Sequence, residues 1–150
     1  MKASTFRRLI NLWPPFLFTG IHATHVSTDY KEVDCKLTLR WYNRNYVGTH
    51  FGGSLFAMTD PWYMLMLMPL MGRDYYVWDQ SAGIEFIAPA RGVVTARFRI
   101  DDTTLATIRE RTDSGEKYLP QFVADITDET GAVVARVTKT VYVRKKPTKR

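Results

Sequence analysis

The alternation of apolar and polar residues is clearest along 33–41, where it is typical of a β-strand with one buried face. The buried face would consist of Val33, Cys35, Leu37, Leu39 and Trp41. Upstream, residues 4–13 carry apolar side chains at helical spacing and are followed by Pro14-Pro15. We therefore expect a short amphipathic helix over 4–13 that ends at the two prolines.

The segment from Gly53 to Leu70 is apolar on almost every side, which predicts a helix enclosed by a sheet. Within it, Pro61 removes one backbone hydrogen bond and should bend the helix. Pro69 and Gly72 fit the C-terminal end of such a helix.

Four further strands and one more helix are expected in the second half of the chain. The strands are predicted at 75–87, 93–100, 118–127 and 132–143, the helix at 103–112, and a hairpin turn at 128–131. The strand over 75–87 alternates around Tyr76, Trp78, Ala82, Ile84 and Phe86. Five strands and one early buried helix predict an α+β fold in which a curved antiparallel sheet wraps around a central apolar helix.

Composition and charge are those of a single soluble domain: 150 residues, 45% of them hydrophobic and 24% charged. Most of the net charge of +6 comes from a basic C-terminal tail over 144–150, and only +1 belongs to residues 1–143. We expect one domain over 1–143 and a solvated tail; the tail could instead contact acidic surfaces or cofactor phosphates. Nucleic-acid binding is disfavoured because the positive charge is not a patch interleaved with aromatic residues.

Several classes of site and location are disfavoured by particular residues. Cys35 is the only cysteine, so it is expected to be a small buried hydrophobe, which is compatible with a reducing cytoplasm. The apolar run 61–72 has 12 residues, short of the ~20 that a membrane-spanning helix needs. Pro14-Pro15 interrupts an N-terminal segment that superficially resembles a signal peptide, so we assign it to the mature domain. His22 and His25, expected in a loop, lack metal-ligand spacing, so no metal is expected.

Residues 45–60 combine two features of a functional site. Gly52-Gly53 allow close approach of the backbone to a ligand and begin a helix whose first N–H groups are unpaired. Asp60 lies in an apolar surrounding, where a buried carboxylate needs a partner or a function. That surrounding consists of Phe56, Met58, Trp62 and Met64.

The same stretch resembles the hotdog-fold thioesterases. Their phenylacetate-pathway branch has an Asn, a Gly three residues later, then His-Gly-Gly, and an Asp nine residues after that His; the matching residues here are Asn45, Gly48, Gly52, Gly53 and Asp60. The position of the family's His holds Phe51, with His50 one residue away. The segment 84–92 resembles the corner between strands that follows the central helix. The runs 48–68 and 75–92 look closer still to an uncharacterised hotdog subfamily, and the similarity covers nearly the whole chain.

The resemblance implies a hotdog fold and three catalytic residues. Asp60 would act as general base or as nucleophile at a thioester carbon, Gly52 would stabilise the oxyanion through its N–H, and the Asn45 amide would contact the same oxygen or orient water. Each has a structural alternative. Asp60 could hydrogen-bond at the Pro61 bend, Gly52 could serve tight packing, and Asn45 could shape its loop.

Five further residues are expected to bind substrate. Met64 and neighbouring methionines suit a pocket for variable acyl chains, alongside Gly53, although core packing explains most of them. Phe51 should wall the pocket, and His50 could assist proton transfer or be structural. Arg91, like Arg97 or Arg99, could meet phosphates or be simply solvated.

The spacing of Gly52 and Asp60 bears on assembly and reaction. Eight residues of helix separate them by ~12 Å, so one carbonyl cannot touch both within a chain. The resemblance implies a site shared between subunits of a homodimer or a dimer of dimers. The expected reaction is hydrolysis of an acyl thioester of coenzyme A or acyl carrier protein, with no cofactor. A non-catalytic acyl-binding or oligomerisation module is the alternative. A dehydratase is disfavoured because its helix acid would fall at Met64, fourteen residues after His50.

Overall fold

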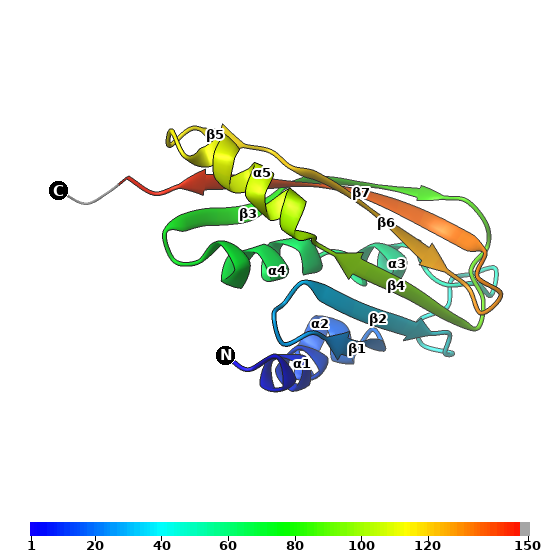
Figure 1. The fold of residues 1–150 in the computed structure, drawn as a ribbon. Coiled ribbons are helices and arrows are strands. Elements are labelled where there is room, and N and C mark those ends of the chain that lie inside the picture. The colour runs from blue at the N-terminus through cyan, green and yellow to red at the C-terminus, as the bar shows by residue number, and fades with distance from the viewer. Residues whose placement is uncertain (148–150) are drawn as a thin grey trace.

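The computed structural model describes residues 1–147 as a curved, fully antiparallel sheet around a helical segment (Figure 1). The strands are β1 (Ile21–Val26), β2 (Glu32–Thr38), β3 (Tyr75–Phe86), β4 (Val93–Arg99), β5 (Lys117–Tyr118), β6 (Gln121–Thr127) and β7 (Val133–Lys145). They follow the order β1-β2-β4-β6-β7-β3, and β5 pairs with β7. The helices are α1 (Ala3–Leu12), α2 (Pro14–Leu17), α3 (Gly52–Ala57), α4 (Trp62–Met71) and α5 (Asp102–Thr112). The predicted architecture, a curved antiparallel sheet around an apolar helix, is confirmed.

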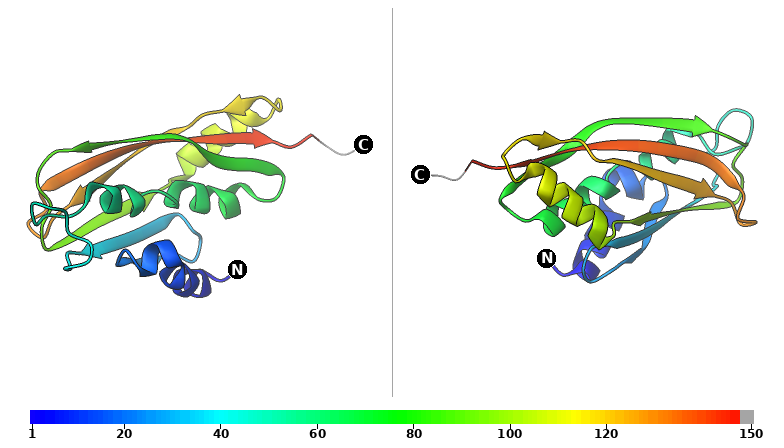
Figure 2. Two further views of the ribbon diagram at one scale, coloured as in Figure 1. Left: turned by 180° about the vertical axis from the view of Figure 1, so that it is seen from behind. Right: turned by 45° about the horizontal axis from the view of Figure 1, so that its top comes forward.

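Helices α3 and α4 occupy the concave side of the sheet, between the β3–β7 side and β1–β2 (Figures 1 and 2). The centre of this core is Trp62, which is fully buried and meets the ring of Phe16 edge-on with centroids 5.4 Å apart. Tyr63 stacks on Phe122 of β6 at 4.3 Å, which fixes α4 against the sheet. Because the helical segment is enclosed by sheet, it carries apolar residues on every side.

The single bent helix predicted for 53–70 is wrong, because the structure breaks it into two helices. Pro61 has no N–H to continue the helical ladder. The carbonyl of Ala57, four residues before Pro61, accepts from the N–H of Asp60 at 3.3 Å instead. The carbonyl of Met58 accepts hydrogen bonds from the indole Nε1 of Trp62 at 2.7 Å and from Cys35 Sγ at 3.3 Å. Helical bonding resumes where the N–H of Leu65 donates to Pro61. The break leaves Asp60 between the two helices.

The N-terminal region contains a strand that the sequence pattern did not predict. His22 and His25 were expected in a loop, but they lie in β1, which pairs with β2. Irregular pairing between Ala23 and His25 interrupts the alternation of buried and exposed residues. Because strand prediction from sequence depends on that alternation, the strand was not predicted. The predicted strand over 33–41 is confirmed only as far as Thr38, since Trp41 is 81% exposed.

A bulge between Asp79 and Ser81 changes which residues of β3 point to each face of the sheet. The predicted alternation treated Tyr76 and Trp78 as one face with Ile84. In the structure Tyr76 and Trp78 are exposed, while Asp79 and Ile84 are partly buried. The bulge reverses the phase of the strand after Asp79, so Ile84 lies on the same, less exposed side as Tyr75, Val77 and Asp79. The strand also forms one edge of the sheet and, among the described residues, pairs with β7 alone.

The C-terminal elements agree with the sequence pattern except at their ends and over 118–127, where the single predicted strand is divided at 119–120 into β5 and β6. The predicted helix over 103–112 is confirmed as α5, and Asp101 caps it by accepting a hydrogen bond from the N–H of Thr104 at 2.7 Å. The last strand runs to Lys145, two residues beyond its predicted end. Lys145 forms an ion pair with Asp113 at 2.7 Å. The end of the expected basic tail, 148–150, lies outside the described residues.

Candidate functional site

The loop before α3 is held together by the side chain of Asn45. Its Nδ2 donates to Thr49 Oγ1 at 2.8 Å and to the carbonyl of His50 at 3.3 Å. Its Oδ1 accepts from the N–H groups of Val47 at 3.1 Å and of Thr49 at 2.9 Å. Every donor and acceptor of the amide is used within the loop. This geometry favours the loop-shaping alternative for Asn45 over direct contact with a reacting oxygen.

His50 is buried beneath this loop, with 3% of its surface exposed. Its Nε2 lies 2.9 Å from the carbonyl oxygen of Gly92, to which it must donate. Burial lowers the pKa of His50 and outweighs the opposing effect of the Gly92 carbonyl. Nδ1 has no hydrogen-bond partner among the described residues. The structure therefore holds His50 as a neutral imidazole that ties the loop to the strand corner.

The glycine pair is required by side chains that approach it, and neither glycine has a positive φ. A Cβ on Gly52 would lie 2.8 Å from Cζ of Phe86, and one on Gly53 would lie 2.5 Å from Cε1 of Phe51. Both separations are too short for carbon atoms, so the two rings can occupy these positions only against glycine. No side chain caps the start of α3, so the N–H of Gly52 has no protein acceptor among the described residues.

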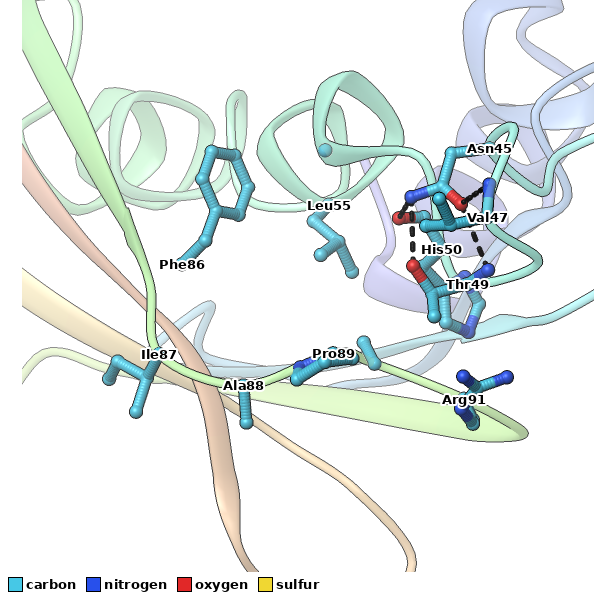
Figure 3. A pocket seen from close by; sticks show the side chains of 12 residues that line it. Asn45, Val47, Thr49, His50, Leu55, Phe86, Ile87, Ala88, Pro89 and Arg91 are labelled. Atoms are coloured by element: carbon cyan, nitrogen blue, oxygen red, sulfur yellow. Dashed lines mark hydrogen bonds between the residues drawn. The ribbon is translucent and has the colours of Figure 1, made fainter.

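Asn45, His50 and Gly52 line a cleft of about 550 Å³ (Figure 3). The cleft lies between the loop that leads into α3, called the glycine loop below, and the segment after β3. In Figure 3, Asn45 and Thr49 form one side, Phe86 to Pro89 form the other, and Leu55 projects from α3 between them. Arg91 lies at one end and is exposed; its Nη1 donates to the carbonyl of Gly48 over a long 3.4 Å, its one hydrogen bond to a described residue. Four of the predicted site residues therefore share this cleft: Asn45, His50, Gly52 and Arg91.

Asp60 and Met64 lie elsewhere, in a cleft of about 460 Å³ between α1 and the start of α4. Apart from Asp60 and Asp79, this cleft is lined by apolar side chains, including Leu9 and Trp13 of the N-terminal segment. Asp60 was expected to be buried, and that expectation is wrong: its side chain is 59% exposed. The break before Pro61 turns the carboxylate outward.

A smaller cleft of about 300 Å³, beside Trp13, brings Asp60 and Gly53 together. Phe51 stands at the cap of α3 and is 57% exposed. The predicted site thus falls into two parts within one chain. The glycine N–H belongs to the first cleft and the carboxylate to the second.

Two residues were missed by the sequence analysis: Asp79, which lines the second cleft, and Lys139, which contacts both Asp60 and Asp79. Lys139 of β7 has a side chain only 3% exposed, and its Nζ lies 2.9 Å from Asp60 Oδ1 and 3.0 Å from Asp79 Oδ2. A usable signal was present in the sequence. Lys139 stands in the inward column of β7, between Val137 and Val141, where a lysine must find an acid.

Other predicted ligand groups have structural partners or remain exposed. Arg99 pairs with Asp34 at 2.7 Å and with Glu32 at 3.6 Å, so it is part of the β2–β4 surface. Arg97 of β4 is exposed. Within residues 1–147, no three His, Cys, Asp or Glu side chains are grouped so as to hold a metal ion. Over the same residues, no helix is long and apolar enough to cross a membrane.

Comparison with known proteins places this geometry in context. The profile of a family described as a domain of unknown function, DUF4442, matches residues 2–143. No curated protein matches the chain.

Several solved structures are similar along nearly the whole chain. A Pseudomonas aeruginosa protein of unknown function, described as a probable thioesterase, has a TM-score of 0.83 at 21% identity over 97% of both chains. A thioesterase from Haemophilus influenzae has a TM-score of 0.70 at 13% identity over 97% of this chain and 92% of that one. A variant of the phenylacetic acid degradation protein from Thermus thermophilus has a TM-score of 0.62 at 19% identity over 86% and 97%. At these identities the likeness shows a shared fold.

Proposed function

The chain belongs to the DUF4442 family and has the hotdog fold of the thioesterase superfamily, and on this premise we propose that it hydrolyses acyl thioesters of coenzyme A or acyl carrier protein. The observation that supports this proposal is the carboxylate of Asp60 on an otherwise mostly apolar cleft. Its Oδ1 accepts from Lys139, which leaves Oδ2 to act on a substrate.

In the proposed reaction, Oδ2 of Asp60 takes a proton from water while the water oxygen bonds to the thioester carbon. The electron pair of the C=O bond moves to oxygen, and the N–H of a Gly52 stabilises the resulting oxyanion. Collapse of this intermediate breaks the C–S bond, and the departing sulfur takes back the proton held by Asp60, giving a carboxylic acid and a thiol. Attack by Asp60 itself would break the C–S bond, release the thiolate and give a mixed anhydride; water then hydrolyses the anhydride, which restores the carboxylate and supplies the proton for the thiolate.

The proposed site needs two chains, because Gly52 and Asp60 line different clefts of one chain. We propose a homodimer, or a dimer of such dimers, in which Asp60 faces the glycine loop of the other subunit. The edge strand β3 supports this assembly, since its outer backbone groups can pair with another strand.

The proposed substrate has an apolar acyl group and a phosphate-bearing carrier. The acyl group would lie along Met64 and the apolar face of α1, where flexible side chains accept variable shapes. Arg91, at the other cleft, would contact carrier phosphates because, among residues 1–147, its guanidinium makes one long hydrogen bond and no ion pair. No cofactor takes part in this reaction. Intracellular acyl carriers and the free thiol of Cys35 fit a cytoplasmic location.

One observation favours the alternative, a non-catalytic module that binds acyl groups or joins subunits. Among the described residues that line the first cleft there is no exposed imidazole, because His50 is 3% exposed with its Nε2 bonded to Gly92, and Phe51 occupies the neighbouring position. Asn45 is likewise engaged within its loop. Such a module would bind the same acyl carriers without releasing a thiol.

The two functions are separated by measuring thiol release from acyl-CoA and acyl-carrier substrates of increasing chain length. We expect turnover by the wild type and a loss of roughly 10²–10⁴-fold in kcat for Asp60→Asn, the usual contribution of a general base. The amide should preserve folding because Lys139 keeps Asp79 as a partner. Asp102→Asn, which changes a surface ion pair on α5, is the matched control. Binding of substrates by the wild type without turnover would establish the non-catalytic alternative.

A further inference from the structure

A lysine ammonium lies under the candidate carboxylate, and this placement is costly unless acids compensate for it. Lys139 occupies an inward position of β7 between Val137 and Val141, and its side chain is 3% exposed. Its neighbours across the sheet are uncharged: Phe122 on β6 and Ala82 on β3. Removing an ammonium from water costs several kcal/mol by general estimates, which only close, well-oriented acids recover.

Both acids that recover this cost come from other parts of the chain. Asp60, in the break between α3 and α4, accepts from Nζ at 2.9 Å, and Asp79, beside the bulge of β3, lies 3.0 Å away. The break between α3 and α4 brings Asp60 to the ammonium, and the register of β3 on β7 brings Asp79, which pairs with Val141, two residues from Lys139. No other ion pair to Lys139 exists among the described residues.

The charges of Lys139, Asp60 and Asp79 do not balance. One ammonium faces two carboxyl groups, and Asp79 Oδ1 is buried without a hydrogen-bond partner. Burial raises the pKa of Asp79, Lys139 opposes this effect, and the charge of Asp60 adds to it. The remaining lining of the cleft carries no charged side chain; Met1 stands at the cleft with most of its surface exposed. Lys2, Arg7 and Arg8 of the N-terminal segment are not among the lining residues.

We propose that Lys139 and Asp79 are positioning residues for the Asp60 carboxylate: Lys139 holds Oδ1 so that Oδ2 faces the cleft, and Asp79 anchors the ammonium. The expected effect of these residues on the rate rests on the proposed hydrolysis. The electrostatic coupling of Lys139, Asp79 and Asp60 rests on their distances alone. An exposed Asp at a helix break has several rotamers, and the bond to a buried, immobile ammonium selects one of them. Lys139 acts through Asp60 and touches no reacting atom.

The coupling is tested first without reference to activity, by following the carboxyl carbon of Asp79 in an NMR pH titration. Asp60→Asn removes a like charge and should lower the pKa of Asp79, whereas Lys139→Met removes the opposing charge and should raise it further. Lys145→Met is the matched control, because Lys145 lies on the same strand in an ion pair of 2.7 Å with Asp113. An Asp79 titration that is unchanged in both cleft variants would overturn the proposal even if the protein is an active thioesterase.

The effect on rate is tested with the same variants. Lys139→Met should lower kcat about 10–100-fold with KM little changed, since small misplacement of a reacting group has effects of this order. Lys139→Arg, which keeps the charge, should recover part of the loss, and Lys145→Met should match the wild type.

Folding and positioning are separated by a double variant. Lys139→Met alone leaves the partly buried Asp79 without its ammonium, which destabilises the fold, whereas Lys139→Met with Asp79→Asn removes both charges. A folded double variant with reduced kcat supports positioning, and one with wild-type kcat refutes it. If the wild type itself releases no thiol, the proposed function fails while the titration result still decides whether the three groups are coupled.

Discussion

Replacing His50 with Gln should remove an acid-sensitive component of stability. Burial lowers the pKa of His50 in the folded protein, whereas an unfolded chain protonates the imidazole at its ordinary value near 6.5. The stabilisation that neutral His50 contributes to the folded protein is therefore present above the unfolded-state pKa. It is lost as the pH falls toward the lower pKa of the folded state. The amide nitrogen of Gln can take the place of Nε2 and keep the hydrogen bond to Gly92, but Gln does not titrate.

The size of the effect has an upper limit set by linkage. If the folded protein kept His50 neutral throughout, lowering the pH from 7.5 to 5.5 would reduce the free energy of unfolding by at most about 1.4 kcal/mol. For a chain of this length that corresponds to roughly 3–6 °C in Tm. A folded-state pKa inside this pH range would give a smaller loss.

The assay is urea unfolding followed by intrinsic fluorescence, at pH 7.5 and pH 5.5, for the wild type and His50→Gln. The carboxyl groups and His22 titrate in both proteins, so the difference between the two pH-dependent losses isolates His50. His25→Gln, a change at an exposed imidazole of β1, keeps His50 and should behave as the wild type. Equal acid-dependent losses for the wild type and His50→Gln would refute the assignment of His50 as a buried, neutral donor.

Three further outcomes follow from contacts in the core and at the glycine pair. Trp62→Ala should lower the free energy of unfolding by about 3–5 kcal/mol in urea titrations, because it empties the core centre and removes the hydrogen bond to Met58; a loss below ~1 kcal/mol would contradict the packing described. Gly52→Ala should change stability by less than ~1 kcal/mol, because the exposed ring of Phe86 can swing aside, yet it should alter acyl-CoA affinity measured by calorimetry. Burial raises the pKa of Cys35 to about 12, so a disulfide reagent at pH 8 should modify it only after unfolding.

The elements of the fold were largely predictable from local patterns. The strand at Val33, the buried helical segment and the helix over 103–112 follow from local sequence patterns, which depend on residues a few positions apart. The strand holding His22 and the phase of Tyr76 were missed because each depends on irregular strand pairing, and periodicity assumes regular alternation.

The candidate site was predictable only in part. The motif indicated Asn45, Gly52 and Asp60, and the structure places all three on clefts. It did not indicate that the Asn45 amide is used up within its loop, because those bonds depend on the loop's conformation. Nor did it indicate that Asp60 is exposed, since the helix break depends on how Met58 is bonded from Trp62 and the neighbouring strand.

By itself, the sequence determined the α+β fold, its apolar central segment and the identity of the groups able to do chemistry. The periodicity of apolar residues and the backbone restriction at Pro61 act over a few residues, so they can be recognised from the sequence alone. Tertiary structure alone decided which groups meet. Lys139 and Asp60 are 79 residues apart in the sequence. They form an ion pair because the fold packs β7 against the break between α3 and α4. A buried ammonium donates to whichever carboxylate the fold brings within hydrogen-bond distance, and how the strands pair decides which carboxylate that is.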